Sequence, residues 1–447
     1  MTSSKNLNDA QPGKLVRNLS LFEATMFGIS YVIGTGVFLK PTSVLSASGS
    51  TFTALMVWVL AGIISLCSAL TIAELAAYIP KLGGLYTYLT EIYGEIVGFM
   101  YGWVTILVAG PGGSAASAIA FSTFASYFIE MNHWQMKLLS FALVLLFGFI
   151  QILSTKGVTR LQVLGTVGKL APVFAIVIFG LFRGGIPGAI NMDLIGDPSK
   201  IGISAALIGA LWAYDGWVAT CTLGEELVDS EKNLPKAIVM ALAFVILVYA
   251  AFNFVIFRTI DAKDILATDT SAGVLVAEQL FGGKGAMLVS LGVLISSAFT
   301  MNAQMMTNER YILPMARRGQ LPASKLLSII HPKFNTPISC IILQICLTSS
   351  FLFVGNFEIL TGIEMFVVWT FFTLAVFGVF ILRKNTEKQE GLYRTPLFPI
   401  VPIIGIAGGG YLVISTLFTN FTLSIVGIGV GLVGLPVFFY FKKKNQG

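Results

Sequence analysis

The chain has 447 residues, of which 55% are hydrophobic and 11% are charged, and its net charge is +6. Because soluble globular domains carry roughly 25% charged residues, this composition excludes a soluble enzyme or binding domain. The basic excess lies between apolar runs, so it indicates membrane topology and not a nucleic-acid partner.

Apolar runs that are long enough to cross a lipid bilayer recur along the whole chain. A spanning helix needs about 20 mostly apolar residues, and barrel strands would instead show short alternating segments. The sequence therefore predicts an all-α membrane protein with twelve transmembrane helices. Their expected windows are 21–46, 52–76, 95–129, 138–155, 159–183, 201–227, 236–258, 284–310, 336–356, 360–382, 396–418 and 421–441.

We expect a single transmembrane transporter domain over 1–447, with no soluble domain attached. A polar tail at 1–20, without a signal-peptide pattern, precedes a first repeat at 21–183 and a second at 201–382. Two additional helices follow at 396–441. Lysine and arginine concentrate in the segments on the same side as the tail, which predicts a multi-pass cell-membrane protein with both termini in the cytoplasm.

Two of the predicted spans are interrupted near their middles. The first contains Gly34–Gly36, and the sixth contains Trp212–Trp217 with an acid and a glycine. Broken helices at membrane depth are tolerated only where their backbone lines a buried or wet cavity. Because the two spans are five apart, they indicate a binding site between two inverted five-helix repeats. The alternative is that the glycines only permit close helix packing.

The polarity of such a site matches an α-amino acid. A half-helix that begins at Gly36 presents free N–H groups to a carboxylate, and Thr35 adds a hydroxyl. A half-helix that ends near Trp212 and Ala213 presents free carbonyls to an ammonium. Trp212 is a candidate aromatic lid over the bound ligand.

Two ionisable residues fall near the middle of predicted spans, Lys169 and Asp215. Charges at this depth are costly, so each is a functional candidate. Asp215 could alternatively cap the N–H groups beyond the break. The sequence leaves open whether the two form an ion pair. Since no other charge is expected near the site, small neutral L-amino acids are the expected substrates.

Metal, cofactor and enzymatic chemistry find no support in the sequence. The four cysteines form no CxxC pair, and both histidines lie in predicted loops. The chain has no GxxxxGK[ST] loop, no HExxH motif and no Ser-His-Asp set. We therefore expect no metal, no cofactor, no ATP-driven pump and no enzyme.

Several motifs together resemble one transporter family. They are Ile33–Phe38, Ala73-Glu74, Ile79–Tyr88, Trp212–Trp217, the loop Glu309–Pro322 and Tyr393–Pro396. The chain resembles the amino acid–polyamine–organocation superfamily over roughly residues 18–441. Within it, the chain is similar to the L-type amino acid transporters, most closely to bacterial members that exchange serine and threonine.

The resemblance implies a LeuT-type fold of ten core helices plus two. It implies that the backbone from Ile33 to Gly36 binds the substrate carboxylate. Carbonyls of Trp212, Ala213 and Asp215 would bind the ammonium, with Trp212 as the gate. It places Lys169 where sodium-coupled relatives hold a cation, with Ser296 and Ser297 as candidate neighbours. This implies sodium-independent obligatory exchange.

The predicted outer loop at 130–137 lacks the cysteine through which animal members bind a glycoprotein subunit, so we expect no such disulfide-linked partner. Proton-coupled symport, with Lys169 or Asp215 as the proton carrier, remains an alternative to exchange. An alternative of another class is an amino-acid-gated channel or a nutrient sensor that does not transport.

Overall fold

The computed structural model describes residues 19–153, 155–195, 201–267, 271–354, 357–387, 389–419 and 421–446. Within these residues the regular structure is helical, apart from one parallel bridge between Leu19 and Leu227. The tail predicted at 1–20 lies outside the described residues except for its last two positions.

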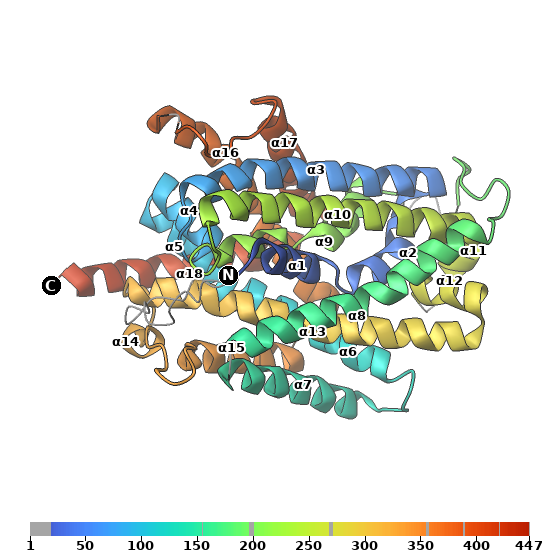
Figure 1. Cartoon of the computed structure of the whole chain (residues 1–447), viewed down its shortest axis with the longest axis horizontal. Coiled ribbons are helices and arrows are strands. Elements are labelled where there is room, and N and C mark those ends of the chain that lie inside the picture. The colour runs from blue at the N-terminus through green and yellow to red at the C-terminus, as the bar shows by residue number, and fades with distance from the viewer. Residues whose placement is uncertain are drawn as a thin grey trace, which may run out of the picture.

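The helices form one elongated bundle (Figure 1). The first half contains α1 (Leu21–Val32), α2 (Gly36–Ser48), α3 (Thr51–Tyr78), α4 (Gly84–Tyr93), α5 (Glu95–Val104), the π-helical turn η1 (Thr105–Ala109), α6 (Gly110–Ala125), α7 (His133–Leu153) and α8 (Thr155–Phe182). The second half contains α9 (Ile203–Tyr214), the 3₁₀ helix η3 (Trp217–Leu223), α10 (Ser230–Thr259), α11 (Ala262–Ala267), α12 (Ala272–Phe281), α13 (Gly283–Arg317), α14 (Ser324–Leu327), α15 (Ile338–Val354) and α16 (Phe357–Asn385). The last two are α17 (Ile400–Thr419) and α18 (Phe421–Gln446).

In the described residues, nine helices are long and apolar enough to span a membrane, or ten if α1 and α2 form one span bent by 43°. The other two predicted spans fall short of this length test for visible reasons. The sixth is divided into α9 and η3, and α15 is only 17 residues long. The third predicted span, 95–129, is one candidate membrane span over Glu95–Ala125, and it contains the π-helical turn.

Large hydrophobic side chains on the outer helices face away from the protein. Leu146 and Phe149 of α7, Phe418 of α17 and Val433 of α18 are all exposed. Such surfaces are unfavourable in water and match the hydrocarbon core of a bilayer. The chain is therefore an integral membrane protein.

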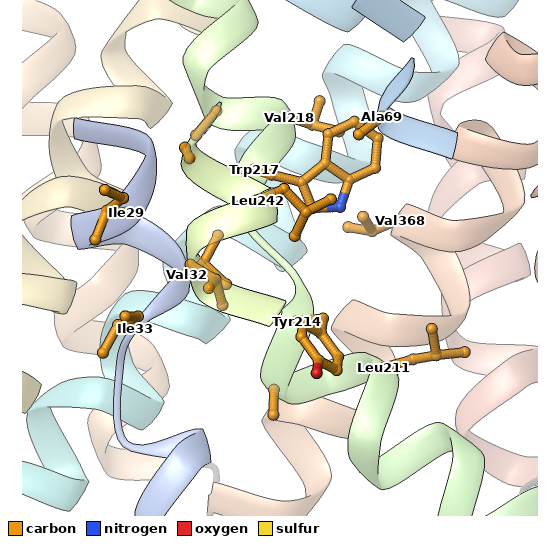
Figure 2. Packing of buried hydrophobic residues seen from close by; sticks show 14 of the residues in the cluster. Ile29, Val32, Ile33, Ala69, Leu211, Tyr214, Trp217, Val218, Leu242 and Val368 are labelled. Carbon is orange, nitrogen blue, oxygen red and sulfur yellow. The ribbon is translucent and has the colours of Figure 1, made fainter. Parts of the chain in front are cut away.

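The broken spans lie at the centre of the bundle. The long helices α3 and α10 lie side by side, and α1 packs against α10, α8 and α13 (Figure 1). Figure 2 shows Val32 and Ile33, where α1 ends, in the same apolar cluster as Tyr214 and Trp217 of the sixth span and Leu242 of α10. This packing holds both breaks inside the protein.

Local sequence fixes where α1 begins. Ser20 and Glu23 form a capping box, in which the Ser20 hydroxyl accepts the Glu23 N–H at 3.2 Å and the Glu23 carboxylate accepts the Ser20 N–H at 2.8 Å. Leu19 just before it donates to Glu226 O, and Val228 donates back to Leu19 O, both at 3.0 Å. We call this end of the bundle the Leu19 end.

Two ion pairs, one buried and one partly buried, hold helices together at the Leu19 end. The Arg310 guanidinium of α13 binds the Glu226 carboxylate, with N···O distances of 2.7 and 3.2 Å. The Arg383 guanidinium of α16 binds the Glu74 carboxylate of α3 through two 2.8 Å bonds. Glu74 also accepts the Thr395 N–H at 2.8 Å.

The glycine-rich segment after α3 forms a short helix at the same end. The segment that carries the motif Ile79–Tyr88 includes the start of α4. Its Tyr86 hydroxyl donates to Gln320 Oε1 at 2.7 Å. Burial raises the pKa of Tyr86 to about 12, so the hydroxyl stays a donor at neutral pH.

Candidate substrate site

The break in the first span exposes backbone donors. Helical bonding resumes with the N–H groups of Phe38 and Leu39, which both donate to Thr35 O. Among the described residues, the N–H groups of Thr35, Gly36 and Val37 have no acceptor. Buried N–H groups at a helix N-terminus, together with the helix dipole, form a ready site for a carboxylate.

The break in the sixth span exposes backbone acceptors. α9 ends at Tyr214, Asp215 is extended, and Gly216 takes a left-handed conformation with φ of 108°. A side chain at Gly216 would also collide with the Tyr31 ring, 2.2 Å from the Cβ position. The Trp212 carbonyl accepts the Asp215 N–H at 3.2 Å, and the Ala213 carbonyl accepts no backbone N–H from the described residues. These carbonyls form the negative end of α9.

The two breaks meet in space. A Cβ on Gly36 would lie 3.0 Å from Ala213 Cα and 3.1 Å from Trp212 Cζ3. The donor end of α2 therefore packs closely against the acceptor end of α9, and the Trp212 ring lies beside it. Lys40 Nζ lies 5.0 Å from the centre of the same ring. The structure thus brings together the predicted carboxylate and ammonium positions, with buried Ile33 at the edge of the first break.

Lys169 is fully buried and links three spans. Its ammonium donates to Ser30 O of α1 and, at 3.3 Å, to Thr300 Oγ1 of α13. A Cβ on Gly34 would lie 3.1 Å from the same Thr300 hydroxyl, so the Lys169 contact reaches the first break. Among the described residues Lys169 forms no ion pair with Asp215, the question that the sequence left open.

The hydroxyl beside the Lys169 ammonium belongs to Thr300, about one turn beyond the expected neighbours. The Ser297 hydroxyl donates to Val293 O of its own helix at 2.8 Å. The Ser296 hydroxyl is buried without a partner in the described part of the chain.

A chain of buried amides continues from Lys169. Gln162 of α8 donates to Ser30 Oγ at 2.5 Å, and Asn302 of α13 donates to Gln162 Oε1 at 2.5 Å. Gln151 of α7 donates to Asn302 Oδ1 at 2.9 Å. These bonds tie α1 to α7, α8 and α13, so a movement of α1 is coupled to the helices around it.

Glu364 of α16 is an acid near the site that sequence reasoning missed. Its side chain is buried, its carboxylate accepts a hydrogen bond from the Trp212 indole, and it interacts with Asp215. The expectation that Lys169 and Asp215 are the only charges near the site is therefore wrong. The signal was present, because Glu364 interrupts an apolar run in the window 360–382 just as Asp215 does in the sixth span.

The part of the chain that the structure describes contains no set of side chains suited to bind a metal ion. No group of three or more His, Cys, Asp or Glu side chains there could hold a metal ion. The site offers backbone dipoles, hydroxyls and two carboxylates, which can bind and release a solute.

Known proteins match this chain over almost its whole length. The family model described as amino acid permease matches residues 19–433. The chain belongs to the amino acid permease family. It is similar to the serine/threonine exchanger SteT of Bacillus subtilis, with 37% identity over 96% of this chain and 98% of that protein.

Animal transporters are more distant relatives of this permease. The human cystine/glutamate transporter is 29% identical over 97% of this chain and 88% of that protein. The mouse Asc-type amino acid transporter 1 is 29% identical over 95% of this chain and 81% of that protein. The permease is thus an amino acid transporter of the amino acid–polyamine–organocation superfamily, related to L-type transporters, with their twelve-helix LeuT-type fold, and it is not an enzyme.

Proposed function

We propose that the protein is a sodium-independent exchanger of small neutral L-amino acids such as alanine, serine and threonine. The contact between the two helix breaks supports this most directly. The N–H groups of Thr35 and Gly36 lie beside the carbonyl end of α9, and these two ends match the carboxylate and the ammonium of a zwitterionic α-amino acid. The narrow clearance between Gly36 and Trp212 favours a small side chain.

In this proposal the substrate carboxylate binds the backbone at Gly34, Thr35 and Gly36. The substrate ammonium binds the carbonyls of Trp212, Ala213 and Asp215, with the Trp212 ring as the lid. The relative named as a serine/threonine exchanger supports both the substrate class and exchange.

Lys169 supports sodium independence. The buried Lys169 amine donates to Ser30 O and Thr300 Oγ1, so it occupies the space between α1, α8 and α13 where a cation would bind. A sodium ion bound between the same helices would make such contacts only when present. With Lys169 there, the site needs no external cation, and the return step requires a second amino acid.

Alternating access would then be rocking of the first repeat, 21–183, against the second, 201–382, around the fixed site. The helices at 396–441 would lie outside this movement. We place the protein in the cell membrane with both termini in the cytoplasm, and without a disulfide-linked glycoprotein subunit.

The test uses purified protein in sodium-free liposomes at equal pH on both sides. Uptake of radiolabelled L-serine is measured in vesicles with and without internal L-serine. We expect uptake only in the loaded vesicles, because the return step needs a bound substrate. Uptake into empty vesicles that follows an imposed proton gradient would instead favour the symporter, and binding without flux would favour the sensor.

A further inference from the structure

Lys40 is a buried cation within the first span. It lies on α2, one turn beyond Gly36, and the residue is only 9% exposed. A charge inside a spanning segment is costly unless other groups stabilise it, so such a residue marks a functional position. Lys40 is therefore a candidate part of the transport machinery.

The Lys40 ammonium lies over the face of the Trp212 ring. The distance from Nζ to the ring centre is 5.0 Å. Residues four apart lie on the same face of a helix, so Gly36 and Lys40 both face the end of α9. Gly36 lets the ring come close, because a Cβ there would lie 3.1 Å from Trp212 Cζ3. An ammonium within about 6 Å of a tryptophan ring centre is attracted by the negative face of the ring.

The Trp212 side chain thus has two anchors. Its indole N–H donates to Glu364 of α16, and its ring face contacts Lys40 of α2. In the proposed rocking movement, α9 and α16 belong to the second repeat and α2 belongs to the first. The Glu364 bond therefore stays within one repeat, whereas the Lys40 contact crosses between the two. A contact that crosses between two moving parts forms and breaks as they move.

We propose that Lys40 is a positioning residue that holds the Trp212 lid closed over the bound substrate. When the repeats close around an amino acid, the ammonium sits on the ring, and when they open, this contact is lost. The contact thereby adds to substrate affinity although Lys40 does not touch the substrate. This inference rests on the proposed exchange function, because it concerns the lid of that same site.

The experiment measures the KM and the maximal rate of L-serine exchange in sodium-free liposomes loaded with L-serine. Lys40→Met keeps the length of the side chain without its charge. We expect its KM to rise about fivefold through loss of the cation–π contact, while the maximal rate changes by less than about twofold. Lys40→Arg should keep a KM close to that of the wild type, because a guanidinium also binds the face of a tryptophan ring.

A double substitution separates the ring contact from any other contact of Lys40. In a Trp212→Ala background, Lys40→Met should change the KM by less than about twofold, because the ring is already absent. Lys137→Met is the matched control, since Lys137 Nζ lies 5.6 Å from the centre of the Trp134 ring, which is 65% exposed. This control removes a cation from a tryptophan ring outside the site, so the KM should not change.

A second measurement leaves Lys40 in place and covers the case in which Lys40→Met does not fold. Protein made with fluorotryptophan has rings with a weaker negative face and nearly the same shape, so its KM should rise about twofold. The same replacement in Trp212→Ala protein should leave the KM unchanged. An unchanged KM in the labelled wild-type protein would refute the role of the Trp212 ring face.

The outcomes separate this inference from the exchange function. The positioning role of Lys40 is refuted, and exchange stands, if Lys40→Met keeps the wild-type KM or if Lys40→Arg raises the KM equally. It is also refuted if Lys40→Met has the same effect with and without the Trp212 ring. Absence of serine exchange in the wild-type protein would refute the proposed function, on which this role depends.

Discussion

Buried charge is handled differently at the Leu19 end of the bundle and at its centre. At the Leu19 end, Arg310 binds Glu226 and Arg383 binds Glu74, each through two hydrogen bonds. At the centre, Asp215 and Glu364 lie near each other, and neither forms an ion pair within the described residues. Paired charges at one end hold helices together, whereas unpaired charges at the centre remain available to a substrate.

Lys169 occupies an intermediate position in this comparison. It is fully buried, but its bonds are to the Ser30 carbonyl and the Thr300 hydroxyl. A carbonyl and a hydroxyl hold an ammonium less tightly than a carboxylate does, so α1 can move without breaking an ion pair. The comparison therefore predicts that substitutions at the Leu19 end affect stability, and substitutions at the centre affect exchange.

The largest expected effect is on stability at the Leu19 end. Arg310→Ala leaves the Glu226 carboxylate buried without its partner, which costs about 3–5 kcal/mol for pairs of this kind. We expect a marked fall in the thermal unfolding temperature of the detergent-solubilised protein.

The control replaces both members of that pair. Glu226→Met combined with Arg310→Met removes both charges and leaves apolar side chains of similar length, so it should destabilise less than Arg310→Ala alone. An equal fall of the thermal unfolding temperature in the single and the double variant would contradict the view that this ion pair stabilises the protein.

The second-largest effect is expected on the exchange rate, from a substitution at the centre of the bundle. Lys169→Ala removes the charge that joins α8 to α1 and α13, and we expect the serine exchange rate to fall about 100-fold, equivalent to about 2.7 kcal/mol, as for a hydrogen-bonded charge. The thermal unfolding temperature should change much less than in Arg310→Ala.

Lys169→Met tests whether charge or length matters at this position. It keeps the length of the side chain without the ammonium, so it should be as slow as Lys169→Ala. Wild-type exchange in either variant would rule out the coupling role of Lys169.

The sequence was sufficient to predict the spans and both breaks because these depend on local features. Long apolar runs predict spans, and glycines at Gly34, Gly36 and Gly216 predict breaks. The contact between Gly36 and Ala213 adds what sequence cannot supply, which is the distance between the two breaks.

Contacts among distant spans were beyond the sequence. The hydroxyl of Thr300, and not that of Ser297, bonds Lys169. Each residue turns a helix by about 100°, so a small error in a predicted helix boundary changes which residues are expected to face Lys169. Glu364 was missed because its importance depends on Trp212 and Asp215, which lie about 150 positions earlier in the chain. The predicted end of span eight at residue 310 was early, because α13 extends to Arg317.

A smaller effect is expected at the lid. Trp212→Ala removes the ring that lies 3.1 Å from the Cβ position of Gly36, and we expect the KM for L-serine exchange to rise about tenfold, or about 1.4 kcal/mol. Trp134→Ala is the control, since Trp134 is 65% exposed on α7. An unchanged KM in Trp212→Ala would remove the lid assignment.

The smallest expected effect tests whether Thr300 acts through its hydrogen bond to Lys169 or through the packing of α13. Thr300→Val keeps the shape of the side chain but removes the hydroxyl 3.3 Å from the Lys169 ammonium, so the exchange rate should fall two- to fivefold, or about 0.5–1 kcal/mol. Thr307→Val makes the same change two turns later, where the buried hydroxyl donates only to Ala303 O of its own helix. If both variants slow exchange equally, the hydroxyl of Thr300 acts through helix packing. If only Thr300→Val does, the weak bond to Lys169 is part of the coupling between α1 and α13.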